Sequence, residues 1–236
     1  ICSEFTDLLE IYSIDECFMD VTLTMHLFGG PWNLALTLKK RIREELGLTC
    51  SVGIGPNKIL AKLAAGMQKP DGLTEIPEQD VGRLLENLPV EKLHGIGEKV
   101  SAKLRDMAIP TVGVLGRTPV QRLKKHFGVL GEVLQAMGKG NCDTPIVPYY
   151  ESPDMKSIGH SHTLEHNTME WEVLSRNLLR LSEMVGRRLR EQKYSGRTVA
   201  LYVRYSDMHT FSRRRTLPCY VDDGYAIYEV ALSILR

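Results

Sequence analysis

Two adjacent acidic residues, Asp15 and Glu16, interrupt an otherwise apolar stretch of the chain. Two carboxylates among apolar residues are unfavourable unless an opposite charge neutralises them. A divalent cation does this well, because Mg²⁺ binds one or two carboxylates together with phosphate oxygens. Successive residues of a regular strand point to opposite faces, so both side chains reach one site only at a hairpin end or a local twist. The residues alone fit a metal site and a solvated strand end equally well.

A second candidate site is Gly95-Ile96-Gly97, which directly precedes a helical pattern. Glycines permit a tight turn, and the unpaired amides at the start of the next helix can form a nest for one phosphate group. Lys99 and Lys103 would add positive charge to that nest. Such contacts do not depend on base sequence and weaken as salt rises. The alternative is a plain glycine-containing connection between two helices.

Three consecutive arginines form the third signal, in a predicted strand near the end of the chain. Because strand residues alternate, Arg213 and Arg215 would share one face of the sheet, and Arg214 would take the other. Phosphate binding is the functional interpretation. Charge that protects an edge strand from unwanted pairing is the alternative.

The elements around the acidic pair alternate between strand and helix, which indicates an α+β layer over residues 1–77. The acidic pair itself is predicted on a strand or at its hairpin end. The patterns after it predict a helix over 31–46, a strand over 49–55, a helix over 57–67, a turn over 69–72 and a strand over 73–76.

From residue 78 to 142 the pattern is helical, with almost no strand signal. The predicted helices are 78–86, 89–93, 98–106, 111–115, 119–126 and 129–136. Three prolines within residues 143–154 disfavour helix, so we interpret 143–155 as an extended linker. The last unit, 156–236, is predicted to contain a strand over 156–164, a helix over 170–192, strands over 198–205 and 210–217, and a helix over 222–236. This order, β-α-β-β-α, lacks one strand of a split β-α-β unit.

Charge is distributed unevenly although the net charge is only +1. Residues 1–77 contain 7 Lys/Arg and 10 Asp/Glu, a net charge of −3, whereas residues 78–150 and 151–236 each have a net charge of +2. An acidic front followed by two mildly basic parts would suit a metal-binding part attached to parts that hold nucleic acid. No apolar run reaches the roughly 18–20 residues needed to cross a bilayer, so we expect no membrane partner.

Two longer stretches carry a family resemblance. Residues 12–22 (YSIDECFMDVT) are very similar to the palm motif of Y-family (translesion) DNA polymerases, the DNA polymerase IV-like or ImpB-MucB-SamB group. Residues 51–73 (SVGIGPNKILAKLAAGMQKPDGL) resemble the second palm signature of the same family. Both stretches occur in the family's order and spacing, and the resemblance continues to Arg236.

The resemblance implies a fold and a set of roles. It implies the C-terminal part of a palm with a ferredoxin-like sheet (1–77), a helical thumb with a helix–hairpin–helix motif (78–142), and a truncated little finger that lacks its last strand (156–236). Asp15 and Glu16 would be catalytic ligands of a two-metal Mg²⁺ site, and Lys69 would bind the nucleotide triphosphate. The implied DNA-binding residues are Gly95, Ile96, Gly97, Lys99, Lys103, Arg204, Ser206, Ser212, Arg213, Arg214 and Arg215.

The implied activity is low-fidelity, template-directed DNA synthesis that bypasses damaged bases during DNA repair in the bacterial cytoplasm, at the nucleoid. The implied partners are primer–template DNA, a deoxynucleoside triphosphate (dNTP) and a sliding clamp bound through a C-terminal tail absent from this chain. Family members carry a further N-terminal segment that completes the palm and supplies the fingers. We therefore expect this chain alone to be inactive. The alternative is a non-catalytic relative that only grips primer–template DNA.

Overall fold

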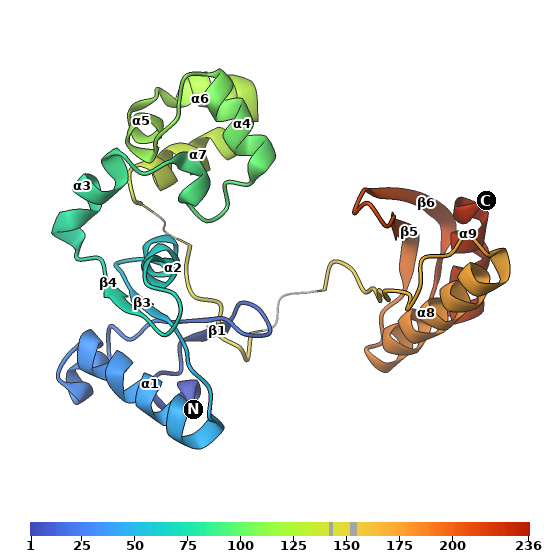
Figure 1. The fold of residues 1–236 in the computed structure, drawn as a ribbon, viewed down its shortest axis with the longest axis horizontal. Helices are drawn as coiled ribbons and strands as arrows, with labels where there is room; N and C mark the ends of the chain where they lie inside the picture. Colours follow the sequence, from blue (N-terminus) through green and yellow to red (C-terminus); the bar gives the residue numbers. More distant parts are fainter. Residues whose placement is uncertain (142–143, 152–154) are drawn as a thin grey trace. The chain divides into compact units, whose positions relative to one another are not determined.

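The computed structural model describes residues 1–141, 144–151 and 155–236, and it divides into two compact units at residues 152/153 (Figure 1). Both units combine helices with strands, which agrees with the predicted α+β class. Within the described residues, no helix is both long and apolar enough to cross a membrane.

Four short strands form two separate sheets in the N-terminal unit. Strands β1 (Leu9–Ile11) and β2 (Cys17–Met19) pair in an antiparallel hairpin, while β3 (Val52–Ile54) and β4 (Leu73–Glu75) pair in parallel. One continuous ferredoxin-like sheet was expected, and the described residues do not form one. A single sheet would need a further strand to pair with the free edges of the two pairs.

Two helices cover these strands, and their ends follow the sequence signals. Helix α1 (Pro31–Leu46) begins with a proline and ends at Gly47, as predicted. Helix α2 (Lys58–Met67) is capped by Asn57, whose side chain accepts a hydrogen bond from the Leu60 N–H. Helix α2 lies so close to β3 that a Cβ on Gly53 would come within 2.0 Å of the Ala61 carbonyl oxygen. The glycine therefore allows this contact between α2 and the strand.

The following segment is helical, as predicted. Its elements are η3 (Glu78–Asp80), α3 (Val81–Glu86), η4 (Val90–Lys92), α4 (Glu98–Asp106), α5 (Val112–Arg117), α6 (Val120–Phe127) and α7 (Leu130–Gly138). One hydrophobic core joins these helices to α2, because Leu60 and Ala64 are buried together with Leu104 and Leu123. This core continues across the proposed palm–thumb boundary near residue 77, and that boundary stays a prediction.

The described part of the predicted linker, residues 144–151, lies along β1. The Tyr149 N–H donates to the Leu9 carbonyl at 2.8 Å, and the Val147 N–H donates to Glu10 Oε2 at 2.8 Å. The segment contains no helix or strand, as predicted. Linker residues 143 and 152–154 lie outside the described residues. The described segment is thus attached to the N-terminal unit rather than free.

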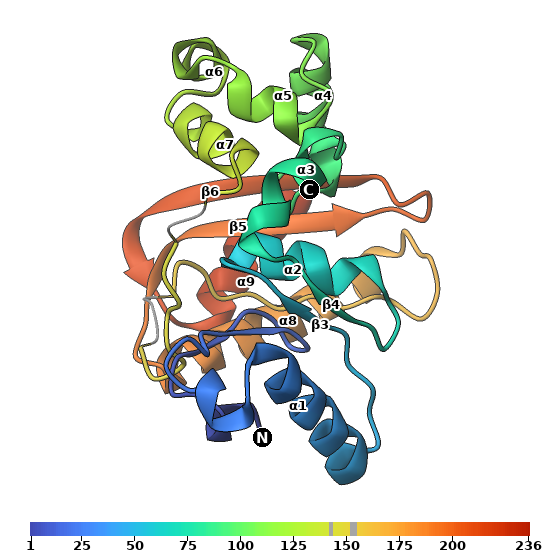
Figure 2. The ribbon, with the colours of Figure 1, turned by 90° about the vertical axis from the view of Figure 1, so that its left-hand side faces the viewer.

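The C-terminal unit consists of helix α8 (Trp171–Glu191), strands β5 (Gly196–Arg204) and β6 (Thr210–Val221), and helix α9 (Gly224–Leu235). The two strands form a long antiparallel ribbon (Figure 2). Buried residues of α8, β5 and α9 form the core, including Leu178, Val199 and Ile227. One face of the ribbon is therefore covered by helices.

The prediction of a strand over residues 156–164 was wrong. Residues 156–164 form no strand in the structure, so the described order of this unit is α-β-β-α. The Gly159 carbonyl accepts a hydrogen bond from Arg188 of α8 at 3.3 Å, and Ile158 packs against the core. Contacts with a helix side chain and with the core hold this segment, and no neighbouring strand pairs with it.

Candidate active site and nucleic-acid interface

Asp15 and Glu16 lie in the turn of the β1–β2 hairpin, hereafter the acidic turn (residues 12–16). The N–H groups of Tyr12 and Ser13 both donate to the Glu16 carbonyl at 3.0 Å and close the turn. The Ser13 hydroxyl donates to Asp15 Oδ1 at 2.8 Å. The prediction of a hairpin end is confirmed. Because Asp15 and Glu16 lie in a turn, the strict alternation of side chains along a regular strand does not apply to them.

Lys62 of helix α2 neutralises one of the two acids. Its amine lies 2.8 Å from both carboxylate oxygens of Glu16 and 4.9 Å from the centre of the Tyr12 ring. Hydrogen bonding from Lys62 is the main cause that lowers the pKa of Glu16, and the charge of Lys69 lowers it further. Glu16 is therefore an anion with a fixed partner.

A second pair lies one helical turn away. The Lys58 amine donates to Glu10 Oε2 at 2.7 Å, and both side chains are about 85% buried, with exposed fractions of 16% and 15%. Burial alone would raise the pKa of Glu10, but hydrogen bonds from Lys58 and the Val147 N–H lower it overall. Lys58 and Lys62 are four residues apart, so one face of α2 presents both amines. This pairing was not predicted from the sequence, although the four-residue spacing of the two lysines signals it.

A tyrosine and a histidine join the acidic turn to the glycine-rich segment. The Tyr12 hydroxyl lies 2.6 Å from His94 Nε2. Burial, followed by the positive charge of Lys62, lowers the pKa of His94 and favours its neutral form. His94 directly precedes Gly95-Ile96-Gly97. Two predicted sites, the acidic turn and this glycine-rich segment, are thus connected within one unit.

Gly95-Ile96-Gly97 forms a tight connection into helix α4. Gly95 has a φ of +94°, a conformation that favours glycine, and Ile96 is buried in the core. Gly97 is the N-cap of α4, where no side chain caps the first amides. Lys99 is exposed beside them. Lys103, by contrast, donates to the His126 carbonyl at 2.5 Å and lies 4.9 Å from the Phe127 ring, so it supports the contact with α6.

The strand register sorts the arginines of β6 between two faces. Arg213 lies opposite Leu201 and Arg215 opposite Val199, on the side that packs against the helices. Arg215 donates to the Ser233 hydroxyl of α9 at 2.8 Å. The predicted alternation is confirmed, and the pair Arg213 and Arg215 belongs to the helix-covered side.

The other side of the ribbon is exposed, and we call it the open face. Its residues are Thr198, Ala200, Tyr202 and Arg204 of β5 and Thr210, Ser212, Arg214 and Thr216 of β6. Arg204, Ser212 and Arg214 were predicted to bind DNA, whereas Tyr202, with an exposed fraction of 72%, was not singled out. Ser206 lies in the turn that joins the strands. Among the described residues, no carboxylate forms an ion pair with Arg204 or Arg214.

Two protein-family models match the chain. The impB/mucB/samB family matches residues 1–66, and the impB/mucB/samB family C-terminal domain matches residues 155–236. DNA polymerase IV of Moorella thermoacetica is 44% identical over the whole chain, and that of Pelotomaculum thermopropionicum is 42% identical. The chain spans 59% and 58% of these two relatives.

Solved structures agree with these matches. A Y-family DNA polymerase chimera, Dbh-Dpo4(243-245)-Dbh, is similar over 99% of the chain and 67% of its own length, with 25% identity and a TM-score of 0.78. DinB from Sulfolobus solfataricus is similar over 99% of the chain and 67% of its own length, with 26% identity and a TM-score of 0.57. The chain therefore belongs to the impB/mucB/samB family of Y-family DNA polymerases.

Proposed function

We propose that the chain is part of a template-directed DNA polymerase that extends a primer with low fidelity past damaged template bases. The observation that carries this proposal is the acidic turn, where two carboxylates occupy one hairpin end beside Lys62. Its relatives named DNA polymerase IV support the same activity. The protein would act in the bacterial cytoplasm, at the nucleoid, and a sliding clamp is a further proposed partner.

The donor chemistry of the acidic turn fits Mg²⁺. The ion prefers oxygen ligands and commonly takes only one or two carboxylates, with water and substrate phosphate completing its shell. Asp15 is exposed, and the exposed fraction of the Glu16 side chain is 40%. Among the described residues, no group of three or more acidic, histidine or cysteine side chains is placed to hold a metal ion. Asp15 and Glu16 would therefore supply only part of the shell, and Glu16 must share or exchange its contact with Lys62.

The residues of this chain would bind and orient the reactants. When bound, Mg²⁺ ions would neutralise phosphate charge and orient the attacking and leaving oxygens. Lys69 is exposed and would bind the triphosphate as a mobile point charge. The amides that follow Gly97, together with Lys99, would contact one DNA phosphate. The open face would follow the duplex backbone through Arg204 and Arg214, without reading its sequence.

Primer extension tests the proposal. The chain would be joined to the upstream segment expected from its family and supplied with Mg²⁺, dNTPs, and undamaged or abasic templates. We expect extension on both templates, and loss of extension in an Asp15→Asn/Glu16→Gln double variant that still binds primer–template DNA. Extension that survives the double substitution would remove the acidic turn from the chemistry.

One observation favours a second candidate, a DNA-gripping relative without chemistry. Both carboxylate oxygens of Glu16 are already held by Lys62. In that case the wild-type protein would bind primer–template DNA and extend nothing, and the double variant would behave identically.

A further inference from the structure

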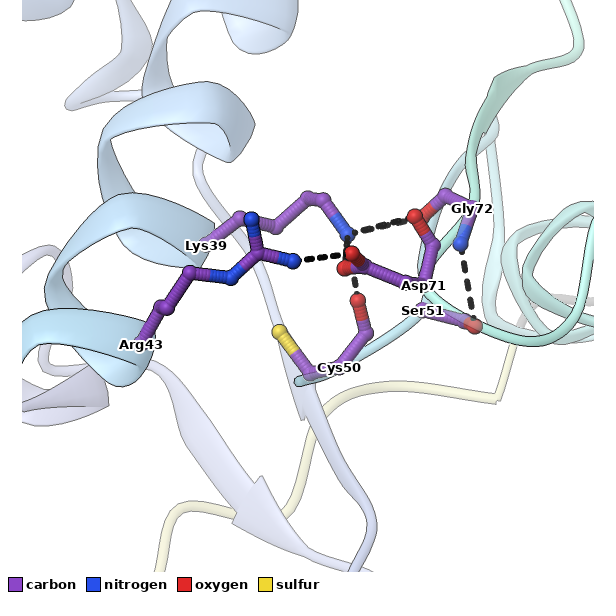
Figure 3. Close-up of polar contacts among 6 residues, drawn as sticks. All are labelled: Lys39, Arg43, Cys50, Ser51, Asp71 and Gly72. Carbon is purple, nitrogen blue, oxygen red and sulfur yellow. Dashed lines mark hydrogen bonds and ion pairs between the residues drawn. The ribbon is translucent and has the colours of Figure 1, made fainter. Parts of the chain in front are cut away.

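Lys39 of helix α1 reaches the turn that carries Lys69 (Figure 3). Its amine donates to Asp71 Oδ1 at 2.6 Å and to the carbonyl oxygens of Cys50, Asp71 and Gly72 at 2.5, 3.0 and 3.2 Å. A lysine ammonium has three N–H donors, so these four oxygens saturate it. The exposed fraction of the Lys39 side chain is only 15%, which leaves water little share in these contacts.

The same carboxylate has a second, more peripheral partner. Arg43, one helical turn after Lys39, forms a short ion pair with Asp71 Oδ2, and its exposed fraction is 61%. The hydrogen bond from Lys39 is the main cause that lowers the pKa of Asp71, with the charge of Arg43 contributing less. Asp71 is thus an anion held between two cations, and Lys39 is the more buried of the two.

The turn has little freedom at its C-terminal end. Asp71 has a φ of +54°, in the left-handed region that few residues tolerate. A Cβ on Gly72 would meet the Gln68 carbonyl oxygen at 2.0 Å, so this position requires glycine. The Gly72 carbonyl also accepts from the Val52 N–H at 3.0 Å. These contacts fix the end of the turn to β3 and to α1.

Lys69 stands at the opposite, N-terminal end of this four-residue turn and is exposed. The direction in which its side chain leaves the backbone depends on how the rest of the turn is held. Lys39 contacts the segment that leads into β3, through Cys50, and the turn itself, through Asp71 and Gly72.

We propose that Lys39 is a positioning residue: its amine fixes the 69–72 turn in the conformation that presents Lys69 to the triphosphate of the incoming nucleotide. This inference rests on the proposed function of Lys69. Lys39 itself would touch no substrate, since its donors are already used within the protein.

The test combines Lys39→Met, Lys69→Ala and the double variant in the protein joined to its expected upstream segment. Methionine keeps the length and apolar stem of lysine and removes only the charged donors. The matched control is Arg41→Met on the same helix, because Arg41 pairs with Glu4 and Glu45 and does not reach the turn. The readouts are KM for dNTP, kcat, equilibrium binding of dNTP to the protein–DNA complex, and thermal unfolding.

We expect Lys39→Met to raise KM for dNTP about tenfold, with kcat changed less than about threefold, because a displaced positioning group weakens binding. In the Lys69→Ala background the same substitution should have little further effect, since coupled residues are not additive. Arg41→Met should leave KM unchanged. Asp71→Asn, which tolerates the left-handed backbone but loses the ion pairs, should reproduce part of the Lys39→Met effect even if the latter folds poorly.

The outcomes separate this inference from the proposed function. The positioning role would be overturned if the effects of Lys39→Met and Lys69→Ala were additive, or if the KM of Lys39→Met were as low as that of Arg41→Met. Synthesis by the wild type would still support a polymerase in that case. If the wild type bound dNTP without extending the primer, the proposed polymerase activity would be contradicted. Weaker dNTP binding by Lys39→Met than by the wild type would still support the positioning role in that case. A protein that neither extends nor binds dNTP overturns both.

Discussion

The acidic turn and the open face hold their charges in opposite ways. In the N-terminal unit, Glu16 and Glu10 each have a dedicated lysine at 2.8 and 2.7 Å. In the C-terminal unit, the described residues form a single ion pair between side chains, Arg187–Glu191, on the exposed surface of α8. Arg204 and Arg214 point away from the helices with no acidic partner among the described residues.

This difference matches two kinds of task. Chemistry at one phosphate requires groups held in a defined geometry, and fixed partners provide it. Holding a duplex of any sequence requires cations that are free to meet phosphates, and their binding depends on salt. If the two regions divide the work in this way, substitutions in the acidic turn should change the rate of synthesis, and substitutions on the open face should change DNA binding.

The largest expected effect concerns the acidic turn. In the protein joined to its expected upstream segment, Asp15→Asn/Glu16→Gln should lower the rate of primer extension by about a thousandfold or more, because the groups that would stabilise the transferred phosphate lose their charge. The affinity for primer–template DNA, measured by fluorescence anisotropy, should change less than about threefold. An equal loss of affinity and rate would contradict a division of labour between the units.

The next effect concerns stability. Lys58→Met leaves the Glu10 carboxylate buried without its partner and should lower the free energy of unfolding by about 2–3 kcal/mol. Arg187→Met, at the exposed pair of the C-terminal unit, should cost less than about 0.5 kcal/mol. Urea unfolding followed by circular dichroism measures both changes. Equal costs would show that the pairs of the two units are equivalent.

The Glu10 pair also predicts a pH dependence. Because the folded pKa of Glu10 is lowered, its contribution to stability is present above the ordinary carboxyl pKa of about 4.3 and is lost as pH falls through the folded value. Glu10→Gln should therefore be less stable than the wild type above about pH 5, and the difference should shrink on acidification. A difference that grows at low pH would have the wrong sign.

The two faces of the ribbon give a smaller and more selective effect. Arg204→Gln/Arg214→Gln, on the open face, should weaken binding to every DNA sequence alike and reduce the salt slope by about two. Arg213→Gln/Arg215→Gln removes the same charge from the helix-covered side and should change the slope by less than about one. Titrations of DNA at several salt concentrations measure both. Equal slopes would mean that total charge matters and the face does not.

The smallest effect distinguishes two lysines of α4. Lys99→Ala should reduce the salt slope of DNA binding by about one. Lys103→Ala should leave the slope unchanged and lower the unfolding temperature, because its amine is already bound to the His126 carbonyl. If the salt slope fell only in Lys103→Ala, Lys103 rather than Lys99 would be the residue that contacts DNA phosphate.

Local signals predicted much of this fold. Pro31 and Gly47 set the ends of α1, and the alternation of strand residues separated Arg214 from its two neighbours. Alternation could not say which face the helices would cover, because that depends on the packing of α9 on the ribbon. The strand predicted over 156–164 failed for a similar reason, since a strand needs a neighbour with which to pair.

The acidic residues of the candidate site could be predicted from the sequence, whereas the lysines that pair with them could not. Two acids within an apolar stretch carry their own signal. The identity of the amine that neutralises Glu16 depends on how α2 crosses the hairpin, which brings Lys62 within 2.8 Å. Lys39 gave no signal at all, because its partners lie more than ten residues away along the chain.

The attachment of residues 144–151 to β1 gives the molecule a defined mechanical path. The chain leaves the helices after α7 and is fastened to Leu9 and Glu10 before it continues to the C-terminal unit. A pull on the C-terminal unit would reach β1 before it reaches those helices. Strand β1 leads directly into the acidic turn. Tension on the C-terminal unit would thus reach first the hairpin that holds Asp15 and Glu16.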